Sequence, residues 1–136
     1  WDTFEADKLS SIWLIRRFID EDAEIAVVPR DSVIPGAVYF DTPTGKFKRT
    51  FDKSTFENMA HYYKIDDRKV DIIGTLIHDI EINTWDKKAY RMTGAVEENV
   101  FRMIRERQSA GRLIERGIHF FDSLYKSLPD TLSRNR

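Results

Sequence analysis

The sequence predicts an α+β fold dominated by helix, with about five helices and a small sheet of two to four short strands. Three observations support this prediction. Five stretches have apolar residues at helical spacing, most of them next to a capping residue. The first fifty residues contain short runs rich in Val, Ile and Phe between turn residues. The 136 residues are 41% hydrophobic and 33% charged, which is typical of one folded domain.

The strands are predicted in short apolar runs that end at turn residues. Proline has no N–H to donate to a sheet, so it closes a strand, and Pro-Gly pairs favour turns. Residues 46–51 fit either a strand or a loop. The predicted strands are residues 1–4, 24–28 and 38–40, separated by Pro29, by Pro35-Gly36 and followed by a turn at residues 42–45.

The helices are predicted from apolar periodicity and from capping residues. Ser54 and Glu57 fit a capping box, in which each side chain bonds a backbone N–H of the other residue. Pro129 ends the last helix, which leaves a single domain of residues 1–128 and a polar tail of residues 129–136. The predicted helices are residues 8–19 after the N-cap Asp7, 54 to about 63, a helix capped by Asp66 or Asp67 that runs through Ile80, residues 93–107, and 109–128.

Composition excludes several classes of function. With 22 basic and 23 acidic residues, the net charge is −1, which gives this chain alone no general attraction to nucleic acid or to anionic membranes. No apolar run approaches the ~20 residues that a membrane span needs. The chain has no cysteine, so disulfides, thiolate metal sites and cysteine nucleophiles are excluded. Gly-rich phosphate loops and the common hydrolase motifs are also absent from the sequence.

The helix predicted over residues 8–19 places an arginine among apolar side chains. At about 100° per residue, Arg16 lies in the middle of an apolar stripe. A buried guanidinium keeps its charge and therefore needs a carboxylate or a bound anion. Either Arg16 forms a structural ion pair, or it binds a small oxyanion together with Arg17 and with Lys8 or Arg49. The stripe consists of Leu9, Ile12, Trp13, Ile15 and Ile19.

A second candidate site surrounds His78. His78 and Glu81 stand three residues apart, so on a helix both side chains can meet one ion, with Asp79 between them and Glu57 from the preceding helix. The cofactor of such a site would be a divalent metal. The apolar periodicity instead directs His78 away from the core, as expected of a surface histidine, and Glu57 already has a role in the capping box. A metal site would also need a third ligand from elsewhere.

Several motifs, in the same order along the chain, resemble the chromate-resistance (ChrB-type) family. The most specific is SIWLIRRFID at residues 11–20, preceded by Asp7-Lys8. The resemblance extends from about Asp7 to Leu128. Its weaker motifs are FDTP at residues 40–43, STFE at 54–57, IHD at 77–79, IERG at 114–117 and FDSLY at 121–125.

The resemblance implies one of two settings for this domain. In that family it is either the effector-sensing part of a chromate-responsive transcription regulator or a stand-alone, often exported protein. The chain has no room for a DNA-binding domain and starts at Trp1 rather than Met, so we expect the stand-alone type with a removed leader, in the periplasm or exported, with the cytoplasm as the alternative. Some relatives have cysteines near residues 9–11 and at residue 54 and a histidine near Arg49; this chain has none of them, which excludes thiol-dependent chromate reduction.

Three hypotheses of function remain open. The first is binding or sensing of a small oxyanion through Arg16 and Arg17, without evident catalysis. The second is a metal-binding protein or metal-dependent enzyme that uses His78 with nearby carboxylates. The third is a protein-interaction module in which the arginine is purely structural. The expected partner is a small anion or a metal ion, and self-association is left open.

Overall fold

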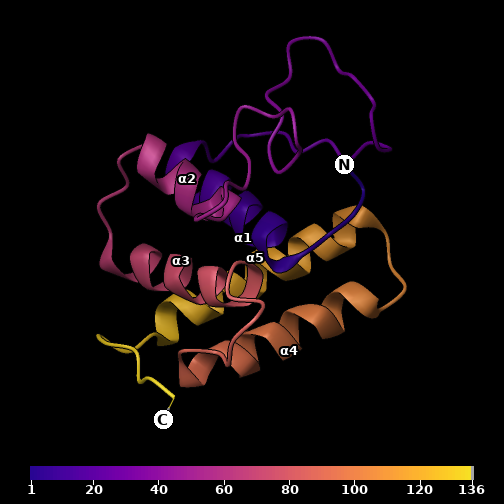
Figure 1. The fold of residues 1–136 in the computed structure, drawn as a ribbon. Coiled ribbons are helices and arrows are strands. Elements are labelled where there is room, and N and C mark those ends of the chain that lie inside the picture. The colour runs from indigo at the N-terminus through magenta and orange to yellow at the C-terminus, as the bar shows by residue number, and fades with distance from the viewer. Residues whose placement is uncertain (136) are drawn as a thin grey trace.

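The computed structural model describes residues 1–135, in which five α-helices form a bundle (Figure 1). The first helix continues directly into a π-helical turn, η1, where the backbone bonds skip one more residue than in an α-helix. The elements are α1 (Ala6–Leu14), η1 (Ile15–Ile19), α2 (Thr55–Tyr62), α3 (Arg68–Glu81), α4 (Arg91–Arg105) and α5 (Ala110–Ser127). None of these helices is long and apolar enough to cross a membrane.

Helix α1 is the centre of the bundle. All nine of its residues are buried, and it contacts each of the other four α-helices. The Trp13 ring, 1% exposed, lies 6.5 Å from the Phe56 ring of α2 and 6.1 Å from the Phe121 ring of α5. A helix with apolar residues on nearly every side is stable only inside the core, and the predicted burial is confirmed for this part of it.

The prediction of an α+β fold is wrong, because residues 1–135 contain helices but no strand. Only two isolated bridges occur there, one joining Phe40 to Phe47 and one joining Tyr90 to Arg134. The apolar runs at residues 24–28 and 38–40 lie in an irregular segment, and residues 1–4 and 46–51 also lie outside any ladder. Proline lacks the backbone N–H that would donate to a neighbouring strand, so the prolines of this segment interrupt strand pairing. Asp31 and Asp41 have positive φ angles of 65° and 55°, which turn the chain away from an extended conformation.

Local capping signals predict most helix ends well. Ser54 and Glu57 form the predicted capping box, Asp67 accepts the N–H of Val70 at the start of α3, and Ser109 accepts the N–H of Arg112 at the start of α5. The first helix begins earlier than predicted, after Glu5, so the prediction that Asp7 is its N-cap is wrong. Asp7 lies inside the first turn, where it has a different role.

Two irregular segments complete the chain. Residues 20–54 leave the end of η1, project from the bundle and return to α2 (Figure 1). The tail lies against the start of α4, where the Arg91 N–H donates to the Ser133 carbonyl and the Asn135 N–H donates to the Ala89 carbonyl, at 2.9 and 2.8 Å. The polar tail is therefore bonded to the domain in the part that the structure describes.

Candidate functional site

Five of the eight predicted site residues gather at one place, where the first turns of α1 and α2 meet the last turn of α3. Lys8 comes from α1, Glu57 from α2, His78 and Glu81 from α3, and Arg49 from the long irregular segment. The other three predicted residues, Arg16, Arg17 and Asp79, do not belong to this junction. The structure thus brings together residues that the sequence analysis assigned to two separate sites.

Arg49 is the central cation of this junction. Its Nη2 atom lies 2.9 Å from Oε2 of Glu81 and 3.5 Å from carboxylate oxygens of Glu5 and Asp7. Burial acts to lower the pKa of Arg49, but the charges of Glu81, Glu5, Asp7 and, least of all, Asp41 hold it above its ordinary value. We call Glu5, Asp7, Asp41, Arg49 and Glu81 the Arg49 cluster. Its four carboxyl groups outnumber its one guanidinium, so it has no cation left to offer an anion.

Asp7 connects the cluster to α2. Its side chain is fully buried, and its two carboxylate oxygens accept the backbone N–H groups of Thr55 and Phe56, both at 2.9 Å. These N–H groups belong to the first turn of α2, where the helix dipole favours a negative charge. Burial raises the pKa of Asp7, and the two N–H bonds offset part of this rise.

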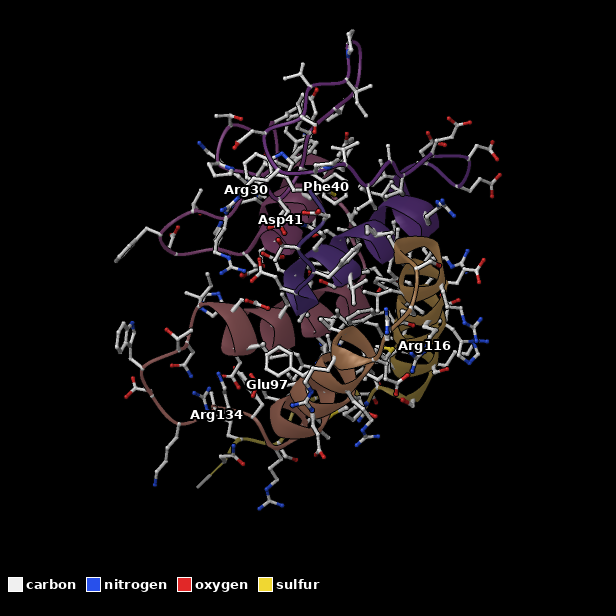
Figure 2. The ribbon with its side chains drawn as sticks, turned by 90° about the vertical axis from the view of Figure 1, so that its right-hand side faces the viewer. Arg30, Phe40, Asp41, Glu97, Arg116 and Arg134 are labelled. Atoms are coloured by element: carbon white, nitrogen blue, oxygen red, sulfur yellow. The ribbon has the colours of Figure 1, made fainter. Side chains whose placement is uncertain are left out.

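Asp41 is held in the left-handed region at φ 55°, beside Phe40 at the base of the irregular segment (Figure 2). The Thr55 hydroxyl donates to its Oδ1 at 2.9 Å, while its buried Oδ2 has no hydrogen-bond partner within residues 1–135. Burial and the neighbouring charge of Asp7 raise the pKa of Asp41 to about 6. Burial and the charge of Glu5 raise the pKa of Glu81 to about 7, although Arg49 acts in the opposite direction. Such shifted carboxyl groups are frequent at functional sites.

Lys8 fixes the amino-terminal segment rather than facing a ligand. Its Nζ atom donates to the backbone carbonyls of Trp1, at 3.0 Å, and of Thr3. Burial lowers the pKa of Lys8, and the charge of Asp41 offsets part of this effect. The ammonium group therefore already has two acceptors.

His78 and Glu57 form a direct pair at the edge of the junction. The His78 Nδ1 atom lies 2.8 Å from Oε1 of Glu57, the same oxygen that accepts the N–H and the hydroxyl of Ser54. The His78 side chain is 39% exposed, so its other nitrogen can reach solvent. A carboxylate on one imidazole nitrogen orients the ring and fixes its tautomer, an arrangement that serves proton transfer or metal binding.

Asp79 has a structural environment. Its carboxylate, 2% exposed, accepts bonds from the Asn83 amide, the Thr93 hydroxyl and the backbone N–H groups of Ala89 and Tyr90. Burial acts to raise the pKa of Asp79, but these hydrogen bonds outweigh it and the pKa lies below its ordinary value. Across residues 1–135, no group of three or more His, Asp or Glu side chains is arranged to hold a metal ion. The third metal ligand that His78 would need is thus not found there.

The two arginines of η1 differ in their partners. Arg17 donates from Nε and Nη2 to both oxygens of Asp122, at 2.9 and 2.8 Å, and Trp13 donates to the same carboxylate. Arg16 is half-buried rather than buried, and its Nε has no hydrogen-bond partner in the described part of the chain. Within residues 1–135 it forms no ion pair. The structural ion pair weighed for Arg16 is therefore not formed in this part of the chain.

Sequence reasoning did not predict the roles of Glu5, Asp7, Asp41 and Thr55 in the junction. The bonds from Asp7 to α2 join residues 48 and 49 positions apart, and no local spacing reveals such a contact. The FDTP motif did single out Asp41, but only by resemblance. A positive φ at a residue other than glycine is the structural feature that marks it.

One comparison with known proteins identifies a family. The family model described as "ChrB, C-terminal domain" matches residues 1–128, which is nearly the whole chain. No curated protein and no solved structure matches the chain. The junction, both arginines of η1 and all five helices lie inside the matched residues.

Proposed function

This chain belongs to the ChrB C-terminal domain family, which indicates a role related to chromate resistance, and on that premise we propose that it binds a small oxyanion at Arg16 without catalysing a reaction. The single observation that supports Arg16 is its Nε atom, which is buried and has no hydrogen-bond partner within residues 1–135. Leaving a buried charged donor unpaired costs free energy that an anion would recover. A planar guanidinium matches two oxygens of a tetrahedral anion.

The other three predicted cationic residues already have partners. Arg49 faces several carboxyl groups, which repel an anion, and Lys8 is bonded to carbonyl oxygens. Arg17 is bound to Asp122, but its side chain is 46% exposed, and exposed ion pairs contribute little free energy. We therefore propose that an anion at Arg16 recruits Arg17, and their existing partners argue against Arg49 and Lys8 as its ligands.

The π-helical turn adds a second reason to favour this place. Residues 15–19 complete fewer turns than in an α-helix, so Arg16 points in a direction that α-helical spacing does not give. Such turns are uncommon and occur often at functional sites, because the wider turn costs free energy unless a specific contact requires it. A bound anion at Arg16 would be such a contact.

Isothermal titration with chromate, sulfate and phosphate tests the proposal. We expect chromate to bind the purified chain and Arg16→Ala to weaken binding about tenfold to a hundredfold, since hydrogen bonds to charged groups contribute about 1.5–3 kcal/mol. Arg16→Lys, which keeps the charge but not the fork, should lie between the two. The matched control is Arg105→Ala, which removes an exposed arginine from the last turn of α4. Absence of binding by all three anions, or equal losses in both alanine variants, contradicts the proposal.

The His78 and Glu57 pair supports the second candidate function, metal binding. Glu57 orients the His78 imidazole at 2.8 Å, which prepares its exposed nitrogen for a divalent metal. Because residues 1–135 hold no group of three His, Asp or Glu side chains arranged for a metal, a bound ion would need water or a second copy of the chain to complete its coordination. Metal analysis of the purified chain and of His78→Ala decides this candidate; a sample that retains no zinc or iron after exposure to either refutes it. Export and self-association stay predictions.

A further inference from the structure

An apolar cavity of about 320 Å³ lies between the irregular segment and the helical bundle. Its walls come from four parts of the chain: Trp1; Ile15 and Ile19 of η1; Met59 of α2 with its C-cap Tyr63; and Phe40 and Phe47 of the segment. None of the eight predicted site residues lines it. Its size is within the range of small-molecule pockets, which are mostly apolar with a few polar groups.

One wall of the cavity is preformed by packed residues. Met59 is 1% and Phe47 6% exposed, and the Phe47 ring lies 5.5 Å from the Tyr63 ring. The turn between Phe40 and Phe47 is closed by the Asp41 N–H, which donates to the Phe47 carbonyl at 2.7 Å. Ordering this part of the wall around a ligand would therefore cost little free energy.

The charges that line the cavity select the kind of ligand. Asp20 and Glu24, both exposed, are among the lining residues, and no lysine, arginine or histidine is. Trp1 also lines the cavity, and the Arg30 guanidinium lies 5.4 Å from its ring. Aromatic rings, among them Tyr39 and Tyr63, line the same space, and the faces of such rings attract cations. Thr42, 5% exposed, also lines it, and its hydroxyl donates no hydrogen bond to another residue of the described chain. Apolar walls, ring faces and acidic groups together favour a cation and repel an anion.

We propose that this cavity binds a small apolar organic cation, with its ring among Ile19, Met59 and Tyr63 and its charge toward Asp20 and Glu24. The Thr42 hydroxyl is available to a polar group of the ligand. Arg16 is not among the residues that line this cavity, although Ile15 beside it is, and the ligand proposed here has the opposite charge. The two proposals therefore stand or fall independently.

Three probes of nearly the same shape test the preference for charge. They are (4-hydroxyphenyl)trimethylammonium, 4-tert-butylphenol and 4-tert-butylbenzoate, which are cationic, neutral and anionic at neutral pH. We expect the cation to bind about three- to thirtyfold more tightly than the neutral phenol, the range that ring-face and carboxylate contacts give, and the benzoate to bind least. The NMR signals of the Ile15, Ile19 and Met59 methyl groups should shift on titration. Equal or tighter binding of the phenol or benzoate overturns the proposal, as does no binding of the cation at about 1 mM.

Two variants locate the binding. Ile19→Trp fills the cavity and should abolish binding of the cation, whereas Val33→Trp, at a side chain 78% exposed in the same segment and outside the lining, should leave binding unchanged. The double variant Asp20→Asn with Glu24→Gln should lose most of the cation preference, because only the ring faces then favour the cation, and it remains informative if Ile19→Trp does not fold. An unchanged cation preference in the double variant refutes the assignment of the charge, and unchanged binding in Ile19→Trp refutes the cavity. Arg16→Ala should bind the cation normally.

Discussion

Replacing Glu81 by glutamine should remove a large part of the pH dependence of stability. Glu81 lies at the end of α3 with its side chain 9% exposed, 2.9 Å from Arg49. Burial and the charge of Glu5 raise its pKa from 4.5 to about 7, against the effect of Arg49. The folded protein therefore binds a proton at Glu81 over a pH range in which the unfolded chain has already released it.

The sign and the magnitude follow from this difference. Because the folded state binds more protons between the two pKa values, the free energy of unfolding must fall as the pH rises from about 4.5 to about 7. At about 1.4 kcal/mol for each pKa unit, the rise from 4.5 to about 7 corresponds to about 3 kcal/mol. Asp41, whose pKa is raised to about 6, adds a fall in the same direction at lower pH. The two effects are coupled through Asp7, so they do not simply add.

Urea unfolding at a series of pH values between about 4.5 and 8 measures the effect. The wild type should lose stability across this range, and Glu81→Gln should lose about 2–3 kcal/mol less, since its amide resembles the protonated carboxyl. Glu115→Gln is the matched control, because the Glu115 side chain is 74% exposed on α5. A wild type that becomes more stable with rising pH, or two glutamine variants with the same pH dependence, refutes the reasoning.

Three further predictions concern stability and can be measured by urea unfolding at neutral pH. Asp79→Ala should destabilise the domain by about 3 kcal/mol or more, because it leaves the buried donors of Ala89, Tyr90 and Thr93 without an acceptor; a loss below about 1 kcal/mol would contradict this. Gly45→Ala should cost about 1–3 kcal/mol, since its Cβ would lie 2.9 Å from the Tyr39 carbonyl oxygen, whereas Gly94→Ala, with nothing within 4 Å, should be neutral or stabilising by up to about 1 kcal/mol. Asp122→Asn should lower the free energy of unfolding by about 1 kcal/mol, because it weakens the bonds from Arg17 and Trp13. These bonds also hold the pKa of Asp122 below its ordinary value, so the difference in stability between wild type and variant should disappear as the pH falls below about 4.

The sequence was a good guide wherever a few neighbouring residues decide the structure. The capping box at Ser54 and the N-caps Asp67 and Ser109 depend on bonds three residues apart, and all three are present. The predicted sheet failed because a ladder depends on distant segments. Short apolar runs such as residues 24–28 are equally suited to line a cavity in an irregular segment, as they do here.

The candidate sites were predicted less well for a similar reason. The angular position of Arg16 was derived from α-helical spacing, which the π-helical turn does not obey. Arg49 and Glu81 were assigned to different candidate sites, yet Arg49 contacts Glu81 and Asp7, and these contacts join chain segments far apart in sequence. Charge and periodicity identify residues of interest, whereas their partners depend on the packing of the whole chain.

The irregular segment of residues 20–54 should open locally more easily than the helical bundle around α1. Few backbone amides of this segment donate to another backbone group, whereas α1 is buried on every side. Amide hydrogens of residues 21–38 should exchange with solvent deuterium rapidly, and those of α1 only when the whole domain unfolds. Asp41 and Arg49 lie at the boundary between these two regions. A ligand that binds there should protect the segment from hydrogen exchange and from protease while the exchange of the core stays unchanged.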